Sequence, residues 1–341
     1  MLPDATKIKI GDNIAKIVEL LQELILGPRL KAIKWSRITK QTPNIKIGYP
    51  GQHLASLISG MFGERTGARG NDLSDGSEVK SCSRIDQLDK CGEKGCGEGV
   101  ARIETECPAC GSKKIKRNND SKWLFTIRSP RDFEVLTKEV PRVMLLLGDY
   151  PNFGRGDHET LRFSAYEIWP ASARHGRFRE LMGNYYANIY LVKHGKDKEK
   201  VPAPKNFWPF SFQFHLCNPI EVFRCSVMNA NTNPTIDIEL YVDPSEDRSQ
   251  MPSLPMPYGL LSPDEVARLI GPVSDQATPE VALGLMPGKT REDLLASLAA
   301  GVVPPTVAPG VSEYLRNFLP LREDRTADAK AEYKRKGRPA A

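Results

Sequence analysis

Four cysteines in a segment almost without aliphatic side chains constrain the fold of this chain more than any other feature. Residues 83–121 are rich in Lys, Glu, Gly and Cys, so they cannot build a hydrophobic core alone. Within them, Cys91-x4-Cys96 is followed after ten residues by Cys107-x2-Cys110. Two short-spaced thiolate pairs suit a closed tetrahedral Zn²⁺ site, whose metal would supply the folding energy of the segment. We expect a structural zinc here; the alternative is four separate free thiols.

The composition is that of a soluble globular chain. Of 341 residues, 40% are hydrophobic and 26% are charged, and the formal net charge of +6 permits a polyanionic partner without requiring one. No apolar run approaches the roughly 20 residues of a membrane span, and the first residues lack the layout of a secretory signal. Seven cysteines, an odd number, then favour metal ligands or reduced thiols over disulfides. We expect a cytoplasmic protein, with Cys82, Cys217 and Cys225 as packed thiols.

Apolar spacing predicts the α/β (α+β) class. Leaving the cysteine segment aside, the order from residue 51 is helix, strand, strand, strand, helix, strand, for which a mixed sheet flanked by helices is the natural packing. Gly27-Pro28 is the predicted stop of the first helix. The predicted helices are 12–26, 51–62, 129–137, 176–192, 262–270, 290–300 and 311–319; the predicted strands are 66–73, 77–82, 122–128, 142–148, 161–169, 207–217, 221–227 and 236–242. The predicted organisation is a helical region at 1–49, a main domain at 50–250 with the insert at 88–120, a second helical region at 251–324 and a disordered tail at 325–341.

A charged hairpin is the strongest candidate for chemistry. If Ser74-Asp75-Gly76 is a three-residue turn with Gly76 in the left-handed conformation, Asp72 lies opposite Glu78 and shares a face with Lys80. Two opposed carboxylates favour a hard cation such as Mg²⁺, beside which an ammonium group can serve an attacking water. A two-residue turn would put Asp75 in place of Asp72. The alternative interpretation is an exposed hairpin with solvated charges.

The hairpin resembles the metal site of PD-(D/E)xK nucleases, with a helix before it, Asp72 as first acid and Glu78-x-Lys80 on the next strand, although Asn71 stands where the family has proline. The surrounding sequence is similar to that of type II restriction endonucleases of the MamI family, in particular Gly-Ala-Arg-Gly at 67–70 and Asp-Gly-Ser-Glu-Val-Lys-Ser at 75–81. The resemblance implies a PD-(D/E)xK-like fold and Mg²⁺-dependent cleavage of double-stranded DNA at a specific site, leaving 5′-phosphates, by a homodimer. It also makes Glu64 a candidate extra ligand, or else a solvated helix-terminal carboxylate.

A basic stretch follows the second cysteine pair. Residues 111–131 carry seven basic side chains against Asp120, a net charge of +6, and such a finger could follow a phosphate backbone. The alternative is that these charges form a solvated face. The same two interpretations apply to a second basic group, formed by Arg174, Arg177 and Arg179 with His175. We expect His53 and His158 to be ordinary hydrogen-bonded histidines. The candidate DNA-binding residues are Lys113, Lys114, Lys116, Arg117 and Lys122, with Arg128 and Arg131 beyond them.

Other functions remain open at this point. A methylation-dependent or repair nuclease of the same fold would use the same hairpin, and RNA is a further possible substrate. A zinc-ribbon DNA-binding regulator would need no catalytic carboxylates at all. The sequence has neither a phosphate-binding glycine loop nor a dinucleotide fingerprint, so no nucleotide cofactor is expected.

Overall fold

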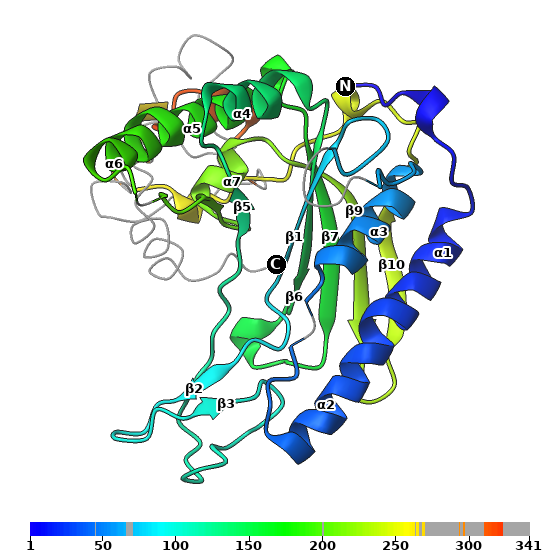
Figure 1. Cartoon of the computed structure of the whole chain (residues 1–341), viewed down its shortest axis with the longest axis vertical. Coiled ribbons are helices and arrows are strands. Elements are labelled where there is room, and N and C mark those ends of the chain that lie inside the picture. Colours follow the sequence, from blue (N-terminus) through cyan, green and yellow to red (C-terminus); the bar gives the residue numbers. More distant parts are fainter. Residues whose placement is uncertain are drawn as a thin grey trace.

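A five-stranded mixed sheet is the centre of the protein, as the computed structural model shows (Figure 1). The structure describes residues 1–44, 46–65, 71–199, 201–262, 264–265, 268–269, 293, 296 and 310–322. The strand order is β1-β6-β7-β9-β10; β1 and β6 are parallel and the other neighbours are antiparallel. The strands are β1 (Glu78–Ser83), β6 (Val143–Asp149), β7 (Leu161–Ile168), β9 (Ile220–Met228) and β10 (Thr235–Tyr241). The predicted mixed sheet is confirmed, and β1 is one of its two edges.

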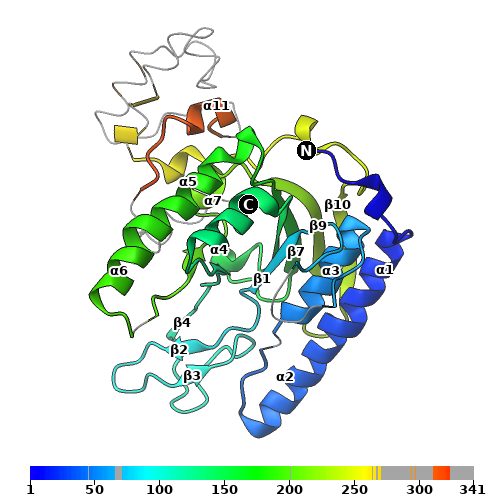
Figure 2. The same ribbon diagram turned by 45° about the horizontal axis from the view of Figure 1, so that its top comes forward.

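Helices cover both faces of the sheet (Figures 1 and 2). On one face, α1 (Asn13–Leu20) and α3 (Gly48–Ser59) pack into a core that includes Val79 of β1, while α2 (Gly27–Thr39) continues from α1. On the other face, Cys82 of β1 belongs to a second, aromatic-rich core. That face is covered by α4 (Pro130–Glu134), α5 (Gly176–Asn184) and α7 (Phe212–Leu216), and α6 (Leu191–Lys196) prolongs α5. Alternation along β1 therefore divides its side chains between two environments. None of the described helices is both long and apolar enough to cross a membrane.

Gly51 lets α3 approach β1 unusually closely. A Cβ at this position would lie 2.1 Å from Ser81 Oγ, a distance that no side chain tolerates. The helix ends at Gly60, which has φ of +69° and can adopt this left-handed conformation because it lacks a Cβ. The tight packing sets the position of α3 relative to the candidate hairpin.

The first helix does not stop at Gly27-Pro28, and that prediction is wrong. A π-helical turn over Leu21–Leu26 joins α1 to α2, and Gly27 N–H donates to Gln22 O, five residues back. Proline lacks an N–H group, and its ring clashes with the carbonyl four residues before it in a regular helix. The wider turn relieves that conflict, and the helix continues to Thr39.

Two predicted strands differ from the structure. The apolar run 207–217 forms only the end of β8 (Lys205–Phe207), because Ser211 Oγ accepts from Phe214 N–H and caps α7 instead. A short apolar run does not distinguish strand from helix by its periodicity. β5 (Trp123–Phe125), shorter than the predicted 122–128, pairs with β8 in a separate two-stranded sheet. Of the three strands predicted between the helices 51–62 and 129–137, only β1 therefore lies in the five-stranded sheet among the described residues.

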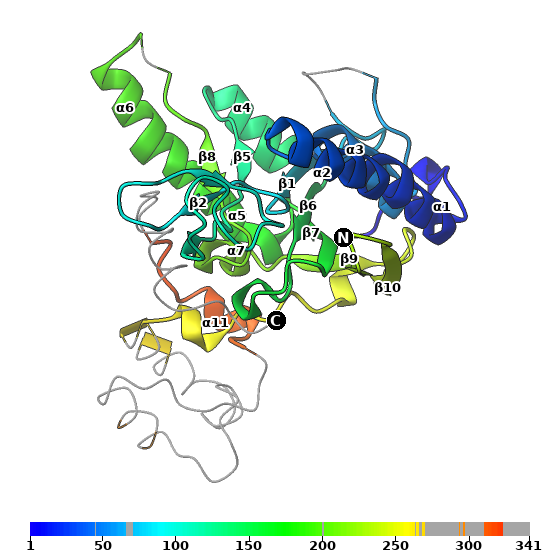
Figure 3. The ribbon, with the colours of Figure 1, turned by 90° about the horizontal axis from the view of Figure 1, so that it is seen from below.

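The cysteine segment folds as a small separate sheet beyond the end of β1 (Figure 3). Its strands are β2 (Asp89–Cys91), β3 (Gly99–Val100) and β4 (Ile115–Lys116), in the order β3-β2-β4 and all antiparallel. Near the C-terminal end, α11 (Glu313–Arg316) begins at the cap Ser312 within the predicted helix 311–319. The predicted helix 290–300 and the tail 325–341 lie outside the described residues, apart from positions 293 and 296.

Candidate active site and metal centre

The hairpin turn before β1 has the predicted three-residue form. Gly76 has φ of +90°, its N–H donates to Leu73 O at 2.9 Å, and Leu73 N–H donates to Ser77 O at 3.2 Å. The strand expected at 66–73 is not seen in its described part, where Leu73 forms only an isolated bridge with Gly63. Asp72 and Glu78 are consequently not a directly opposed pair, which corrects that expectation.

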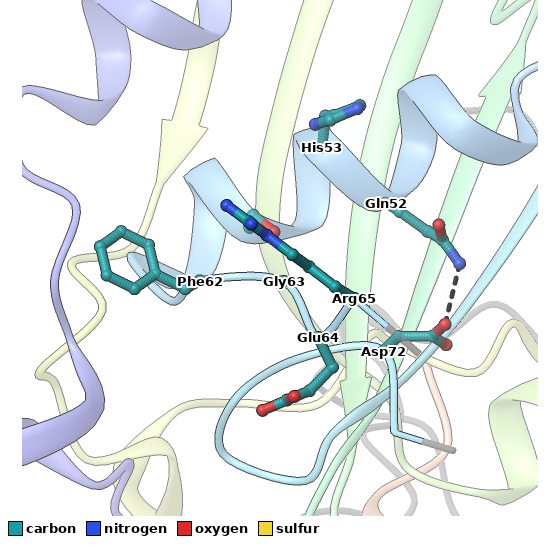
Figure 4. A pocket seen from close by; sticks show the side chains of 8 residues that line it. Gln52, His53, Phe62, Gly63, Glu64, Arg65 and Asp72 are labelled. Atoms are coloured by element: carbon teal, nitrogen blue, oxygen red, sulfur yellow. Dashed lines mark hydrogen bonds between the residues drawn. The ribbon is translucent and has the colours of Figure 1, made fainter. Parts of the chain in front are cut away.

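Asp72 instead reaches the free edge of β1 with its side chain. Its Oδ2 accepts from Val79 N–H at 2.7 Å, and its Oδ1 accepts from Gln52 Nε2 on α3 at 2.8 Å (Figure 4). The opposite edge of β1 pairs with β6, so only this edge is available to the carboxylate. A carboxylate has about four lone-pair directions, and these two hydrogen bonds use two of them. Asp72 thus retains the capacity to bind a cation.

Glu78 and Lys80 project from the same face of β1, as the alternation predicts. Lys80 Nζ donates to Glu78 Oε1, and the Lys80 side chain is 28% exposed while that of Glu78 is 22% exposed. Backbone contacts fix both residues, because β1 pairs in register with β6 from Glu78 onward. Two carboxylates and an ammonium group are therefore held at or next to Val79 of this edge strand, and these are residue types that can bind a hard cation and stabilise added negative charge.

Asp75 has a structural task that the sequence did not reveal. Its Oδ2 lies 2.9 Å from Arg142 Nη2 and accepts from Ser77 Oγ, while its Oδ1 accepts from Ser77 N–H. Arg142, only 1% exposed, also pairs with the buried Glu167 at 3.0 Å. These bonds hold the turn against the body of the sheet. Of the two alternatives, the contacts favour Asp72 as the carboxylate available to a metal.

Glu64 shares a pocket with Asp72 but does not join its carboxylate. The two residues line a cavity of about 490 Å³ together with Gln52, His53, Phe62 and others, and Glu64 N–H donates to Asp72 O. The Glu64 carboxylate points away from that of Asp72 (Figure 4). Within the described part of the chain, no group of three carboxylates converges at this hairpin.

The four cysteines do converge. Their sulfurs all lie within 4.8 Å of one another, with Cys91 and Cys110 Sγ atoms 3.6 Å apart and Cys96 and Cys107 Sγ atoms 3.7 Å apart. Zn–S bonds of about 2.3 Å in a tetrahedron put the sulfurs roughly 3.8 Å apart, so the spacing fits four thiolates on one ion. Although burial opposes it, hydrogen bonds from the backbone N–H groups of Ala109 and Cys110 lower the pKa of Cys107 to about 7, which favours the ligating thiolate.

Buried charges tie the insert together and to the main domain. Asp89, completely buried, pairs with Arg102 at 2.9 Å and with Arg117 at 2.8 Å. The Arg102 guanidinium lies 4.6 Å from the centre of the Phe153 ring. Arg117, a candidate DNA contact, is thus engaged inside the insert and also donates to the carbonyl of Glu104.

Two of the other four basic candidates have partners within the chain. Lys114 lies 3.3 Å from Glu93, and Lys122 Nζ lies 5.1 Å from the centre of the Trp208 ring. Lys113 and Lys116 are exposed. The arginines of the second basic group also have partners within the chain: Arg174 binds Glu313, Arg177 binds Glu180, and Arg179 binds the carbonyls of Pro170 and Ser172.

The candidate histidines divide between the interior and the pocket. His175 is buried, accepts from Trp169 N–H through Nδ1 and contacts Asn218 O through Nε2. Burial, with Arg174 as second cause, lowers the pKa of His175 to about 4. His158 packs against the rings of Tyr150 and Phe153, and His53 lines the pocket beside Asp72. None of them belongs to a metal-ligating cluster in the described residues.

Comparison with known proteins identifies relatives of this chain. The family model of the MamI restriction endonuclease matches residues 34–259, about two thirds of the chain. The type II restriction enzyme MamI of Microbacterium ammoniaphilum is 39% identical over 57 residues, which are 17% of this chain and 18% of that enzyme. The match therefore spans less than a fifth of the length of that relative. No solved structure matches.

Proposed function

The chain belongs to the MamI restriction endonuclease family, and from this membership and the edge-strand geometry we propose that it is a type II restriction endonuclease that hydrolyses double-stranded DNA at a specific site. The observation that carries the proposal is the Asp72 carboxylate held against Val79 N–H, beside the Glu78–Lys80 pair on the same strand. These are the residue types that phosphodiester hydrolysis with a divalent cation requires.

Asp72 and Glu78 would hold Mg²⁺, which supplies Lewis acidity toward a phosphate oxygen and a more acidic bound water when present. Both offer only carboxylate oxygens, the donor chemistry that this ion prefers. Gln52 and Val79 N–H fix the orientation of Asp72. Lys80, held by Glu78, can donate to the attacking water or to the phosphate as negative charge develops there. By the family resemblance, the products carry 5′-phosphates.

Zn²⁺ is the metal that we assign to the four cysteines. Four thiolates leave no open coordination position for water, so its role would be structural. The apolar core of the insert is small: it consists of Cys91, Cys107 and Val100, with Cys96 and Ile115 partly buried against them.

A homodimer is the assembly that fits the substrate. Cleaving both strands requires two copies of the hairpin site, and a two-fold symmetric dimer matches a palindromic sequence.

The decisive experiment is digestion of unmethylated phage DNA by the purified chain with Mg²⁺, followed by mapping of fragment ends. We expect discrete fragments with 5′-phosphates and no cleavage by the Glu78→Ala variant. Cleavage confined to methylated DNA would identify a modification-dependent nuclease instead. Metal-independent DNA binding without any cleavage would identify a zinc-ribbon regulator and refute the proposal.

A further inference from the structure

Helix α2 and the residues after it carry a concentration of positive charge that the hairpin and the insert do not explain. Between Glu23 and Glu64 the sequence contains no acidic residue. The same stretch contains six Lys or Arg residues: Arg29, Lys31, Lys34, Arg37, Lys40 and Lys46.

Among these six residues, Arg29 is the one whose side chain binds buried groups of the described part of the chain. It is buried, and its guanidinium donates to both Asp86 oxygens, at 2.7 and 2.9 Å, and to the carbonyl of Ala230. Lys31, Lys34 and Arg37 are exposed, and none of the three forms an ion pair with a described residue. Like charges at this helical spacing repel one another. The helix dipole favours cations near the C-terminus, but its effect falls off within the last turn and does not extend back to Lys31.

Two large apolar side chains lie among these cations. Trp35 is 58% exposed and Ile38 is 62% exposed. At 100° per residue, both fall on the arc of the helix that carries Lys31 and Lys34, opposite the buried Ile33 and Ser36. A mixed basic and aromatic face that leaves its apolar side chains in water is typical of an interaction surface, in particular for a charged polymer with planar or hydrophobic groups.

We propose that this surface, Lys31, Lys34, Trp35, Arg37 and Ile38 of α2 (the α2 face), contacts the phosphate backbone of the duplex DNA substrate. The inference rests on the proposed function, since DNA is the polyanion that such an enzyme must hold. The charge of this surface is complementary to that of DNA. Lys31, Lys34 and Arg37 are exposed, and the 40 residues between Glu23 and Glu64 contain no carboxylate.

The anchoring of α2 relates this surface to the hairpin. The Arg29–Asp86 pair joins the start of α2 to the chain just after β1, so α2 and the cysteine insert project past the same end of the sheet (Figures 1 and 3). From Lys80 to Asp86 the chain covers six residues, at most roughly 20 Å at about 3.3 Å per residue. That is about six base pairs at 3.4 Å each. Duplex DNA that is bound at the hairpin and extends along β1 would thus contact the α2 face with the base pairs that flank the cleavage site.

The test compares the full-length chain with two charge-matched variants in the absence of Mg²⁺. The first is Lys31→Gln/Lys34→Gln/Arg37→Gln. The control is Lys193→Gln/Lys196→Gln/Lys198→Gln, which removes three exposed charges on and after α6, away from α2 (Figure 2). Fluorescence anisotropy of a 30-base-pair random-sequence duplex at several salt concentrations gives the affinity and its salt dependence.

We expect the α2 variant to bind at least tenfold more weakly near 0.1 M salt, with a log–log salt slope smaller by up to about three units. The control should stay within twofold of the wild type. Trp35→Ala, which keeps every charge, should weaken binding while leaving the salt slope unchanged, and circular dichroism checks that each variant is folded. Equal affinity and slope for wild type and α2 variant would overturn the inference.

Two further outcomes are distinguishable. A wild-type chain that binds no duplex would overturn the proposed function together with the inference. An α2 variant that retains DNA affinity but no longer binds vesicles of anionic phospholipid, to which the wild type does bind, would assign the α2 face to a membrane surface and overturn the inference alone.

Discussion

Asp72 and Asp75 lie three residues apart, and their contacts predict opposite consequences when each is changed to its isosteric amide. Asp75 is 9% exposed and pairs with Arg142, which is 1% exposed. Removing one partner of a fully buried ion pair costs about 3–5 kcal/mol. Arg142 keeps Glu167 as a second partner at 3.0 Å, so we expect Asp75→Asn to lower the free energy of unfolding by the smaller amount of about 2–3 kcal/mol. Its cleavage rate per folded molecule should stay close to that of the wild type.

Asp72→Asn should have the opposite effects, with stability nearly unchanged and cleavage lost. The new amide oxygen can still accept from Val79 N–H, and Gln52 can rotate its own amide to accept from the new NH₂ group. We therefore expect a change in stability below about 1 kcal/mol. The negative charge that would hold the cation is lost, so cleavage should fall by orders of magnitude.

Urea denaturation of both variants, followed by cleavage of supercoiled plasmid DNA with Mg²⁺, measures the two effects separately. Rates are divided by the folded fraction at the assay temperature. The reasoning is refuted if Asp75→Asn abolishes cleavage with an unchanged denaturation midpoint while Asp72→Asn cleaves normally, because the turn would then present Asp75 to the metal.

Further changes test the rest of the structure. Lys80→Gln should bind DNA with wild-type affinity but cleave at least 100-fold more slowly, and an unchanged single-turnover rate would remove Lys80 from the chemistry. Gly51→Ala should cost more than about 2 kcal/mol in urea denaturation, because its Cβ would meet Ser81 Oγ at 2.1 Å; Ser81→Gly should restore part of the loss. Cys107→Ser should reduce bound zinc, measured by elemental analysis, from one equivalent to below one half, while far-UV circular dichroism retains the signal of the sheet core. Since burial lowers the pKa of His175 to about 4 from about 6.5 in the unfolded chain, its contribution to stability is complete above pH 6.5 and is lost as the pH falls toward 4, by at most about 1.4 kcal/mol per unit. Replacing His175 with Gln should flatten that part of the stability–pH curve.

Local chemistry made parts of the site predictable. Gly76 and Asp75 specify a tight turn by their own backbone and side-chain preferences, and the cysteine pairs specify a metal-sized cluster by spacing alone. Alternation along an edge strand then gave the common face of Glu78 and Lys80. In each case the interactions involve residues that are near in sequence.

Interactions between distant residues account for what was missed. Gln52, 20 residues before Asp72, holds its carboxylate, and Arg142, 67 residues after Asp75, holds the turn. Nothing in the local pattern marks either residue, because a single Gln on a helix or Arg before a strand is common. The helix that continues through Pro28 depends on an i→i−5 hydrogen bond that the apolar periodicity does not reveal.

Buried arginine–aspartate pairs hold β1 at both ends, and this arrangement bears on how the zinc insert relates to the hairpin. Arg142 fixes the turn before the strand through Asp75, and Arg29 fixes the segment after it through Asp86. The insert begins beyond Asp86, and its own ion pair of Asp89 with Arg102 uses neither of these carboxylates. Unfolding of the insert would thus stop at Asp86. If the unfolding included Asp86, Arg29 would be left buried without its partner, at a cost of several kcal/mol. A metal-dependent module can therefore be carried next to an edge strand without making the geometry of Asp72, Glu78 and Lys80 depend on zinc.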